Sequence, residues 1–352
     1  MNVKDINPEI LARQIVPPTK LPPDQTLLDL HYYMKLTREL EFRIERKLYR
    51  QGKIVGGVYV GRGQEAVSVA GGLFLQKGDV FAPLIRDQAG RAAFGEPLLN
   101  VARTYLGSRQ GTMRGRDGNI HRGYPEAGQL AMISHLGAMV AVVVGKLFAK
   151  RMKGEKGFVG LTTIGEGGMQ TGATHEGMNI AAVEKVPLVL VVANNHWAYS
   201  TPNDREFACA NLVDRARGYG FEGHKVDGTD LGACLEVIGR AVARARAGGP
   251  PQLVVASLLR LSGHGEHDDA SYVPAEMKKE SWAEDCVLKT EKLILERGWL
   301  AAATLKEWRA EISTEVEKAV ETAQREAVPL GSDEDWCAIS TRELVDQPGS
   351  ES

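Results

Sequence analysis

The chain has 352 residues, a formal net charge of −2 and a sequence pI of about 6.5. This length allows a large hydrophobic core, and the lack of a basic excess argues against nucleic acid as a partner. The longest apolar run, residues 136–148, contains glycines and a lysine and is too short to span a membrane. The N-terminus is charged and unlike a secretory signal, and the four cysteines lack metal-site spacing. We therefore expect an intracellular protein that binds neither nucleic acid nor membranes.

Three segments are expected along the chain. Residues 1–25 contain five prolines, which predicts an extended N-terminal arm. Residues 26–329 alternate apolar runs with amphipathic stretches, which predicts one α/β domain with a helical C-terminal part. Residues 330–352 are expected to form a disordered tail.

Predicted helices and strands alternate through most of the domain. Helices are expected at residues 26–51, 171–183, 213–219 and 231–247, and strands at residues 80–86, 158–164, 186–192, 221–226 and 252–259. The strand segments are short runs of apolar and β-branched residues, as in strands buried on both faces. From residue 274 onward the pattern is helical, and Gly298 is expected to end one helix. The fold class predicted is a doubly wound, mostly parallel sheet flanked by helices.

The stretch of residues 165–202 carries the strongest chemical signal. Glu166 lies between Gly165 and Gly167 where a predicted strand ends, and Asn195 follows the next strand. In open α/β sheets, ligands bind at the carboxyl ends of the strands. Carboxylate and amide oxygens suit a Mg²⁺ ion that also holds phosphates, and the start of the intervening helix can bind an anion. The stretch therefore predicts a site for a magnesium-bound diphosphate.

In this stretch G-E-G is followed, one βαβ unit of roughly 30 residues later, by N-N. This pattern resembles the thiamine diphosphate motif of 2-oxo acid dehydrogenase α subunits. The G-E-G turn and the later S-T-P are most similar to the branched-chain member. The resemblance implies the thiamine diphosphate-binding fold, with thiamine diphosphate and Mg²⁺ as cofactors. It also implies that Glu166, the Asn195 side chain and the backbone carbonyl of Trp197 bind Mg²⁺, and that Gly165 and Gly167 contact the cofactor.

Earlier segments resemble the same family in the same order. Arg86, at the end of a predicted strand, corresponds to an arginine that contacts the cofactor diphosphate. His121, in the glycine- and arginine-rich loop of residues 107–123, corresponds to a histidine of the site wall and is a catalytic candidate. Ser134 and Leu136 correspond to residues that line the cofactor, where the leucine wedges beneath it to hold its bent shape.

Residues 260–272 form a polar loop after a predicted strand, a common place for catalytic side chains. Arg260, His264, Asp268 and Asp269 match the R-x-x-x-H and D-D positions of the family's loop. His264 is the expected acid/base and cofactor-contacting group, because an imidazole exchanges a proton near neutral pH. Arg260 is expected to hold the loop or the substrate carboxylate. Gly265 replaces a serine that kinases phosphorylate in some eukaryotic members, so that control cannot operate here.

The resemblance implies that the chain is half of an enzyme. A β subunit would supply the carboxylate that activates the cofactor, and the two would form a heterotetramer. The complex would decarboxylate a small 2-oxo acid, with branched chains favoured, and transfer the acyl group to a lipoyl-bearing acyltransferase. The expected location is the bacterial cytoplasm or, in a eukaryote, the mitochondrial matrix.

Other functions remain open at this stage. Pyruvate or acetoin could replace the branched substrate, since side chains that the sequence does not place decide the specificity. A transketolase-like carbon transfer is less favoured, because that class carries both halves in one longer chain. A catalytically silent structural subunit is the alternative of another class. It stays open because of three departures from the family pattern, at Tyr59, Ile85 and Gln88.

Overall fold

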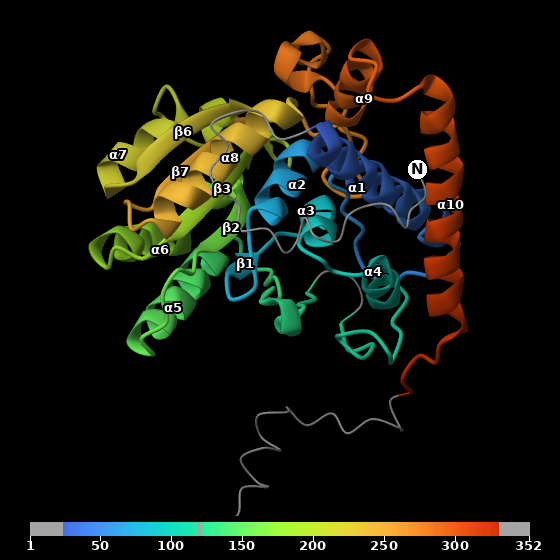
Figure 1. The fold of residues 1–352 in the computed structure, drawn as a ribbon, viewed down its shortest axis with the longest axis horizontal. Coiled ribbons are helices and arrows are strands. Elements are labelled where there is room, and N and C mark those ends of the chain that lie inside the picture. The colour runs from blue at the N-terminus through green and yellow to red at the C-terminus, as the bar shows by residue number, and fades with distance from the viewer. Residues whose placement is uncertain (1–23, 118–120, 331–352) are drawn as a thin grey trace, which may run out of the picture.

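The structure is a computed structural model that describes residues 24–117 and 121–330. The expected arm, apart from its last two residues, and the expected tail, apart from Leu330, lie outside the described residues. The described part is a parallel sheet covered by helices, with further helices along one side (Figure 1). No helix in the described ranges is long and apolar enough to cross a membrane.

Five parallel strands form the sheet, in the order β1-β2-β3-β7-β6. The strands are β1 (Val80–Ala82), β2 (Gly160–Gly165), β3 (Leu188–Asn194), β6 (Glu222–Asp227) and β7 (Gln252–Ser257). Gly165 of β2 pairs with Ala193 of β3, and Asn194 pairs with Ser257 of β7. The carboxyl ends of the three central strands therefore meet at one edge of the sheet. The predicted parallel α/β fold is confirmed.

The first strand is shorter than predicted. Residues 80–86 were expected to be a strand, but β1 ends at Ala82. Pro83 comes next and has no N–H to donate to the ladder. The N–H of Leu84 instead donates to the Asp87 carboxylate and to the Thr163 hydroxyl, each at 2.9 Å. Arg86 therefore lies in a turn after the strand.

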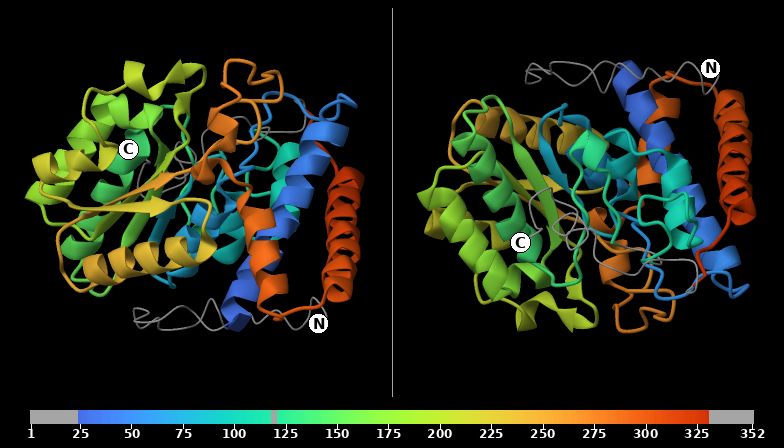
Figure 2. Two further views of the ribbon diagram at one scale, coloured as in Figure 1. Left: turned by 90° about the horizontal axis from the view of Figure 1, so that it is seen from above. Right: turned by 90° about the horizontal axis from the view of Figure 1, so that it is seen from below.

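Helices cover both faces of the sheet (Figure 2). Val189 and Val191 of β3 belong to the core beneath α2 (Glu65–Leu73) and α8 (Leu231–Arg246). Leu188 and Leu190 belong to the core beneath α5 (Ala138–Met152) and α6 (Gly172–Val183). Successive residues of a strand face opposite sides, so the continuous apolar run in β3 supplies both cores. The side chain of Asp230 caps α8 by accepting the N–H of Ala233 at 2.9 Å, as its position before the helix predicted.

A third core lies along one side of the sheet domain. It joins α1 (Asp24–Arg43), the π-helical turn Ile44–Leu48, α4 (Leu98–Tyr105) and α10 (Ala302–Arg325), which runs along the outer side in Figure 1. The predicted helix 26–51 is thus α1 followed by a π turn. The remaining elements are α3 (Gln88–Ala93), α7 (Arg215–Tyr219), α9 (Cys286–Glu296) and the short strands β4 (Trp197–Ala198) and β5 (Thr201–Pro202). Gly298 follows α9 with φ +66°, which confirms it as a helix terminator.

Candidate cofactor and active site

A cavity of about 540 Å³ lies at the carboxyl ends of β2 and β3. All the predicted site residues except His121 line it: Arg86, Ser134, Leu136, Gly165, Glu166, Gly167, Asn195, Trp197, Arg260 and His264. They come from separate segments, which the sheet topology brings to one edge. The sequence prediction of one shared site is consistent with this placement.

Glu166 lies directly after β2 and is only 1% exposed. Its Oε2 accepts the backbone N–H of Asn195 at 3.1 Å, whereas its Oε1 is buried and has no hydrogen-bond partner in the described structure. Burial, and then the charge of Glu206, raises the pKa of Glu166 to about 7. A buried carboxylate oxygen without a donor is costly unless a cation or another ligand satisfies it.

The other two predicted metal ligands follow β3. Asn195 and Trp197 are each 8% exposed. Asn195 Oδ1 accepts the N–H of Trp197 at 3.3 Å, and the Trp197 carbonyl accepts an Arg260 N–H at 3.3 Å. Each oxygen has a second lone pair available for a cation.

Among the described residues, no group of three or more His, Cys, Asp or Glu could hold a metal ion. This finding is compatible with the predicted set, which has only one carboxylate beside an amide and a backbone carbonyl. Such all-oxygen donors suit Mg²⁺, which usually takes one or two carboxylates together with substrate phosphates.

The glycines beside Glu166 serve different purposes. A Cβ added at Gly165 would have no atom of the described structure within 4 Å, so this backbone faces open cavity space. A Cβ at Gly167 would lie 2.5 Å from the Cβ of Ala198, so this glycine allows two chain segments to approach closely. Gly167 also begins a 3-10 turn that ends at Gln170, before α6. This turn, and not the start of α6 as predicted, presents its first residue to the cavity.

Arg86 projects from the turn after β1. Its guanidinium donates to the carbonyl of Val60 at 2.8 Å and to the carbonyl of His264 at 2.5 Å, and it lies 5.9 Å from the ring centroid of Tyr59. Burial, and then the nearby Arg260, lowers its pKa to about 10, so it stays cationic at neutral pH. Arg86 therefore supplies positive charge to the cavity and also anchors the loop that carries His264.

His264 lies between two tyrosine rings. The ring centroids of Tyr59 and Tyr199 lie 5.5 Å and 4.6 Å from that of His264. Burial, and then the charges of Arg86 and Arg260, lowers the pKa of His264 to about 4. The imidazole is therefore neutral at physiological pH and can accept a proton within the cavity.

Arg260 fixes the loop that follows β7. Its guanidinium donates to the carbonyl of Tyr199 at 3.1 Å and to the Tyr272 hydroxyl at 2.6 Å, in addition to Trp197. Asp268 accepts the N–H of His264 at 2.5 Å and the Tyr272 hydroxyl at 2.6 Å. Of the two predicted roles for Arg260, these contacts match holding the loop. Asp269 is exposed and accepts the N–H of Ser271, so only the first of the paired aspartates reaches the His264 backbone.

Leu136 and Ser134 precede α5. Leu136 is 49% exposed and lines the cavity, so it is not a core residue. The Ser134 hydroxyl lies 2.5 Å from His121 Nε2, and Asp117 contacts His121 Nδ1 at 2.5 Å. His121 was expected in the site wall. In the structure it does not line the cavity itself, but it contacts Ser134, which does.

Two of the three departures from the family pattern lie at the cavity. Tyr59 and Ile85 line it, and Ile85 contributes apolar surface to the wall. Gln88 is buried outside the cavity, where it accepts an Arg122 N–H at 2.5 Å and donates to the Ile85 carbonyl at 3.1 Å. Gln88 therefore has a structural explanation that does not involve a ligand.

Sequence reasoning missed several residues that line the cavity. These are Gln64, Leu84, Asp87, Met132, Thr163, Ile164, Ala193, Ala198 and Tyr199. Thr163 and Ala193 lie at the ends of β2 and β3, so strand position could have identified them. Tyr199 has φ +56°, a loop conformation that the sequence did not indicate.

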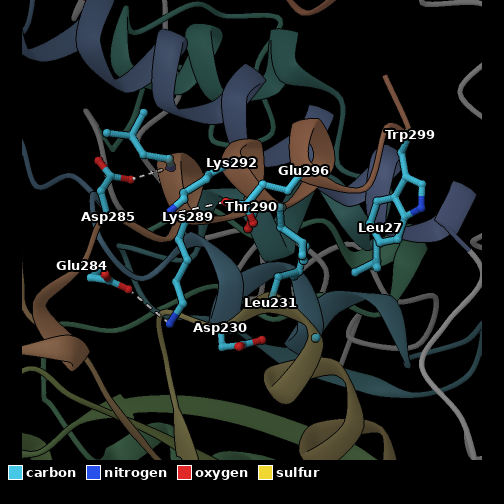
Figure 3. Close-up of a pocket in the computed structure, with 13 residues that line it drawn as sticks. Leu27, Asp230, Leu231, Glu284, Asp285, Lys289, Thr290, Lys292, Glu296 and Trp299 are labelled. Carbon is cyan, nitrogen blue, oxygen red and sulfur yellow. Dashed lines mark hydrogen bonds and ion pairs between the residues drawn. The ribbon is translucent and has the colours of Figure 1, made fainter. Parts of the chain in front are cut away.

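A second cavity, of about 510 Å³, lies between α9 and the starts of α1 and α8 (Figure 3). Leu27, Leu231 and Trp299 form apolar wall, and Lys289 pairs with Glu284 at 3.4 Å. It contains none of the predicted site residues. A further cavity, of about 580 Å³, contains only Arg260 of the predicted site residues, so the cavity at the strand ends is the candidate active site.

The strand ends of this parallel sheet bring together a buried carboxylate, an amide, two arginines and a histidine between two tyrosine rings, which suits a cofactor site of an α/β enzyme. Residues 32–330 match the model of the family described as "Dehydrogenase E1 component", and the chain belongs to this family. Its members use thiamine diphosphate. The chain is an α subunit of a 2-oxo acid dehydrogenase component.

Relatives with different substrates are about equally similar. The α subunit of acetoin:2,6-dichlorophenolindophenol oxidoreductase from Cupriavidus necator is 32% identical over 312 residues, 88% of this chain and 92% of that protein. The α subunit of 2-oxoisovalerate dehydrogenase from Bacillus subtilis is 32% identical over 304 residues, 86% and 91% of the two chains. The α subunit of the pyruvate dehydrogenase E1 component from Porphyra purpurea is 29% identical over 310 residues, 86% and 90%. These names imply a β partner and leave the substrate undetermined.

Proposed function

We propose that this chain and a β subunit catalyse the thiamine diphosphate- and Mg²⁺-dependent oxidative decarboxylation of a 2-oxo acid. The acyl group would pass to lipoyl groups of an acyltransferase. The observation that carries the proposal is the buried Glu166, which lines the same cavity as Asn195 and Trp197 and whose Oε1 has no hydrogen-bond partner in the described structure. A divalent cation would satisfy that oxygen, and the all-oxygen donor set fits Mg²⁺.

The residues of the cavity fit thiamine diphosphate in charge and in shape. Glu166, the Asn195 side chain and the Trp197 carbonyl would hold Mg²⁺, and Arg86 would add positive charge for the diphosphate. Gly165 leaves open space beside its backbone, so a ligand can approach closely. The half-exposed Leu136 offers an apolar support for the rings.

The cofactor, when bound, supplies a carbanion that adds to the 2-oxo carbon and accepts the electrons left when CO₂ departs. The protein's part is to bind, orient and exchange protons. His264 is neutral and can accept or return a proton near the reacting carbon, while Tyr59 and Tyr199 hold its ring in place. Arg260 keeps the loop of His264 against the strand ends.

Among the possible substrates we favour a branched 2-oxo acid. Ile85 makes the cavity wall more apolar, which suits an aliphatic side chain. Pyruvate and acetoin are the alternatives, because relatives carrying those names are equally similar. A catalytically silent structural subunit, which would not be an enzyme by itself, is a further alternative. Tyr59 and Ile85 support it, because they depart from the family pattern and line the site. We also propose an intracellular location, bacterial cytoplasm or mitochondrial matrix.

The test is turnover by the complex that co-purifies with this chain, with an artificial electron acceptor, added thiamine diphosphate and Mg²⁺. We expect faster turnover of 3-methyl-2-oxobutanoate than of pyruvate or acetoin. A higher rate with pyruvate or acetoin would reassign the substrate. No turnover with β subunit and cofactor present would favour the silent subunit, and full activity of this chain alone would contradict a half-enzyme.

A further inference from the structure

Glu206 lies behind the predicted metal ligands, in the loop that continues from β5. Its Oε1 accepts the backbone N–H of Ala198 at 3.0 Å. Its Oε2 is buried and, in the part of the chain that the structure describes, has no hydrogen-bond partner. Glu206 is not among the residues that line the cavity, so it does not contact the cofactor space directly.

The Ala198 N–H and the Trp197 carbonyl belong to one peptide unit. Because a peptide group is planar and trans, its N–H and C=O point in opposite directions. A carboxylate that holds the N–H of Ala198 therefore fixes the direction of the Trp197 carbonyl on the opposite side. That carbonyl oxygen is the backbone ligand predicted for the cation, and Trp197 lines the cavity.

Local backbone geometry gives such an anchor a role beside the pairing of β4 with β5. His196 and Tyr199, on either side of this peptide unit, have φ +68° and +56°. Non-glycine residues adopt these angles at some energetic cost, so the surrounding contacts must maintain them. Within this loop, the Glu206 bond to Ala198 and the Arg260 bond to Tyr199 are contacts that can do so.

A second observation connects Glu206 with the cation site itself. The neighbouring carboxylate, Glu166, is 1% exposed and also has one oxygen without a partner. A Cβ added at Gly167 would lie 3.7 Å from Glu206 Oε2, so this oxygen is close to the turn that carries Glu166.

We infer that Glu206 is a positioning residue of the divalent-cation site: it orients and polarises the Trp197–Ala198 peptide so that the Trp197 carbonyl faces the cation. The inference rests on the proposed function, because it presumes a cation at Glu166, Asn195 and Trp197. Negative charge on the N–H side of a peptide increases electron density on its carbonyl oxygen, which strengthens that oxygen as a ligand. Mutation of residues that hydrogen-bond to the ligands of a metal commonly changes the protein's affinity for that metal by about 10- to 100-fold.

The test compares Mg²⁺ affinity in the full chain, purified together with its β subunit, at saturating thiamine diphosphate. Tryptophan fluorescence and calorimetry report the affinity without reference to turnover. The variants are Glu206→Ala, which removes the acceptor, and Glu206→Gln, which keeps an acceptor without the charge. Asp204→Asn is the matched control, because Asp204 lies exposed on the same turn and carries the same charge.

We expect Glu206→Ala to weaken Mg²⁺ binding about 10-fold or more, Glu206→Gln to weaken it less, and Asp204→Asn to leave it unchanged. The apo melting temperature of Glu206→Gln should equal that of the unmodified protein. Equal Mg²⁺ affinity in all variants would overturn the inference, as would equal losses in Glu206→Gln and Asp204→Asn. If the unmodified protein binds no Mg²⁺, the proposed function fails together with the inference. If the unmodified protein binds Mg²⁺ and the Glu206 variants bind it equally well, only the inference fails.

Discussion

The backbone N–H of Asn195 donates a hydrogen bond to Glu166 Oε2 at 3.1 Å. This bond joins the ends of β2 and β3, so two proposed cation ligands are positioned by each other before a cation binds. Glu166 Oε1, which has no hydrogen-bond partner in the described structure, is left for the ligand. Preorganisation of this kind reduces the ordering that binding must otherwise impose.

The first prediction concerns Glu166→Gln, which keeps the shape of the side chain and removes its charge. We expect Mg²⁺-dependent stabilisation by thiamine diphosphate to disappear while the fold is retained. In the unmodified protein, ligand at 100 times its Kd should add about 2.7 kcal/mol. Thermal unfolding with and without cofactor measures this. Glu176→Gln, at an exposed position of α6, is the control, and a cofactor-dependent shift that survives in Glu166→Gln would contradict the assignment.

The second prediction concerns pH. The pKa of Glu166 is raised from 4.5 to about 7, first by burial, so the folded chain binds this proton more tightly than the unfolded chain. The resulting stabilisation is complete below about pH 4.5 and is lost as the pH rises to about 7. Because a cation competes with the proton, Mg²⁺ affinity should increase over this range and level off above about pH 7. Calorimetric titration at several pH values tests this, and affinity that falls with rising pH would refute it.

The third prediction separates chemistry from binding. His264→Ala should lower turnover by roughly 10²- to 10⁴-fold, as expected for loss of a general acid/base, and should leave cofactor affinity unchanged. His267→Ala is the control, since His267 is exposed on the same loop. Steady-state kinetics and cofactor titration measure the two effects. If His264→Ala and Glu166→Gln lose cofactor affinity equally, this division of roles is wrong.

The fourth prediction compares two leucines. Leu136 is 49% exposed at the cavity, and Leu147 of α5 is 0% exposed in the core. Leu147→Ala should lower the free energy of unfolding by about 2–5 kcal/mol. Leu136→Ala should change it by less than about 1 kcal/mol but weaken thiamine diphosphate binding. Urea unfolding and cofactor titration distinguish them, and a large loss of stability in Leu136→Ala would assign it to the core.

The fifth prediction concerns the loop of residues 260–272. Arg260→Lys removes the planar group that bonds to Trp197, Tyr199 and Tyr272 together. We expect faster cleavage of this loop by chymotrypsin, with protection on adding cofactor. Arg240→Lys, in an exposed ion pair with Glu236, should have no effect. Unchanged proteolysis in Arg260→Lys would show that the loop is held by other contacts.

Much of the fold could be predicted because β2, β3 and β7 are buried on both faces and are rich in apolar and β-branched residues. The error at β1 came from Pro83, which interrupts a run that continues in apolar composition. The π turn at Ile44–Leu48 was not predicted either, since its residues continue the spacing of α1.

The candidate site was predictable where a residue's role follows from its place at a strand end, as for Glu166 and Asn195. The 3-10 turn that begins at Gly167 was not predicted, because its position depends on where α6 starts. Glu206 could not have been identified from sequence, because its contact with Ala198 depends on the left-handed conformation of Tyr199 in the intervening loop. The roles given to these residues remain predictions that the experiments above test.

The pairing of β3 with β7 has a consequence for the biosynthesis of the chain. Val189 of the central strand pairs with Gln252, so one edge of β3 has no partner until β7 leaves the ribosome. During that interval a strand that is apolar except for Asn194 presents open hydrogen-bonding groups, which favours aggregation. Non-local parallel pairing of this kind also folds slowly. Soluble production of the chain should therefore improve at low expression temperature, and truncations that end before Ser257 should accumulate as insoluble protein.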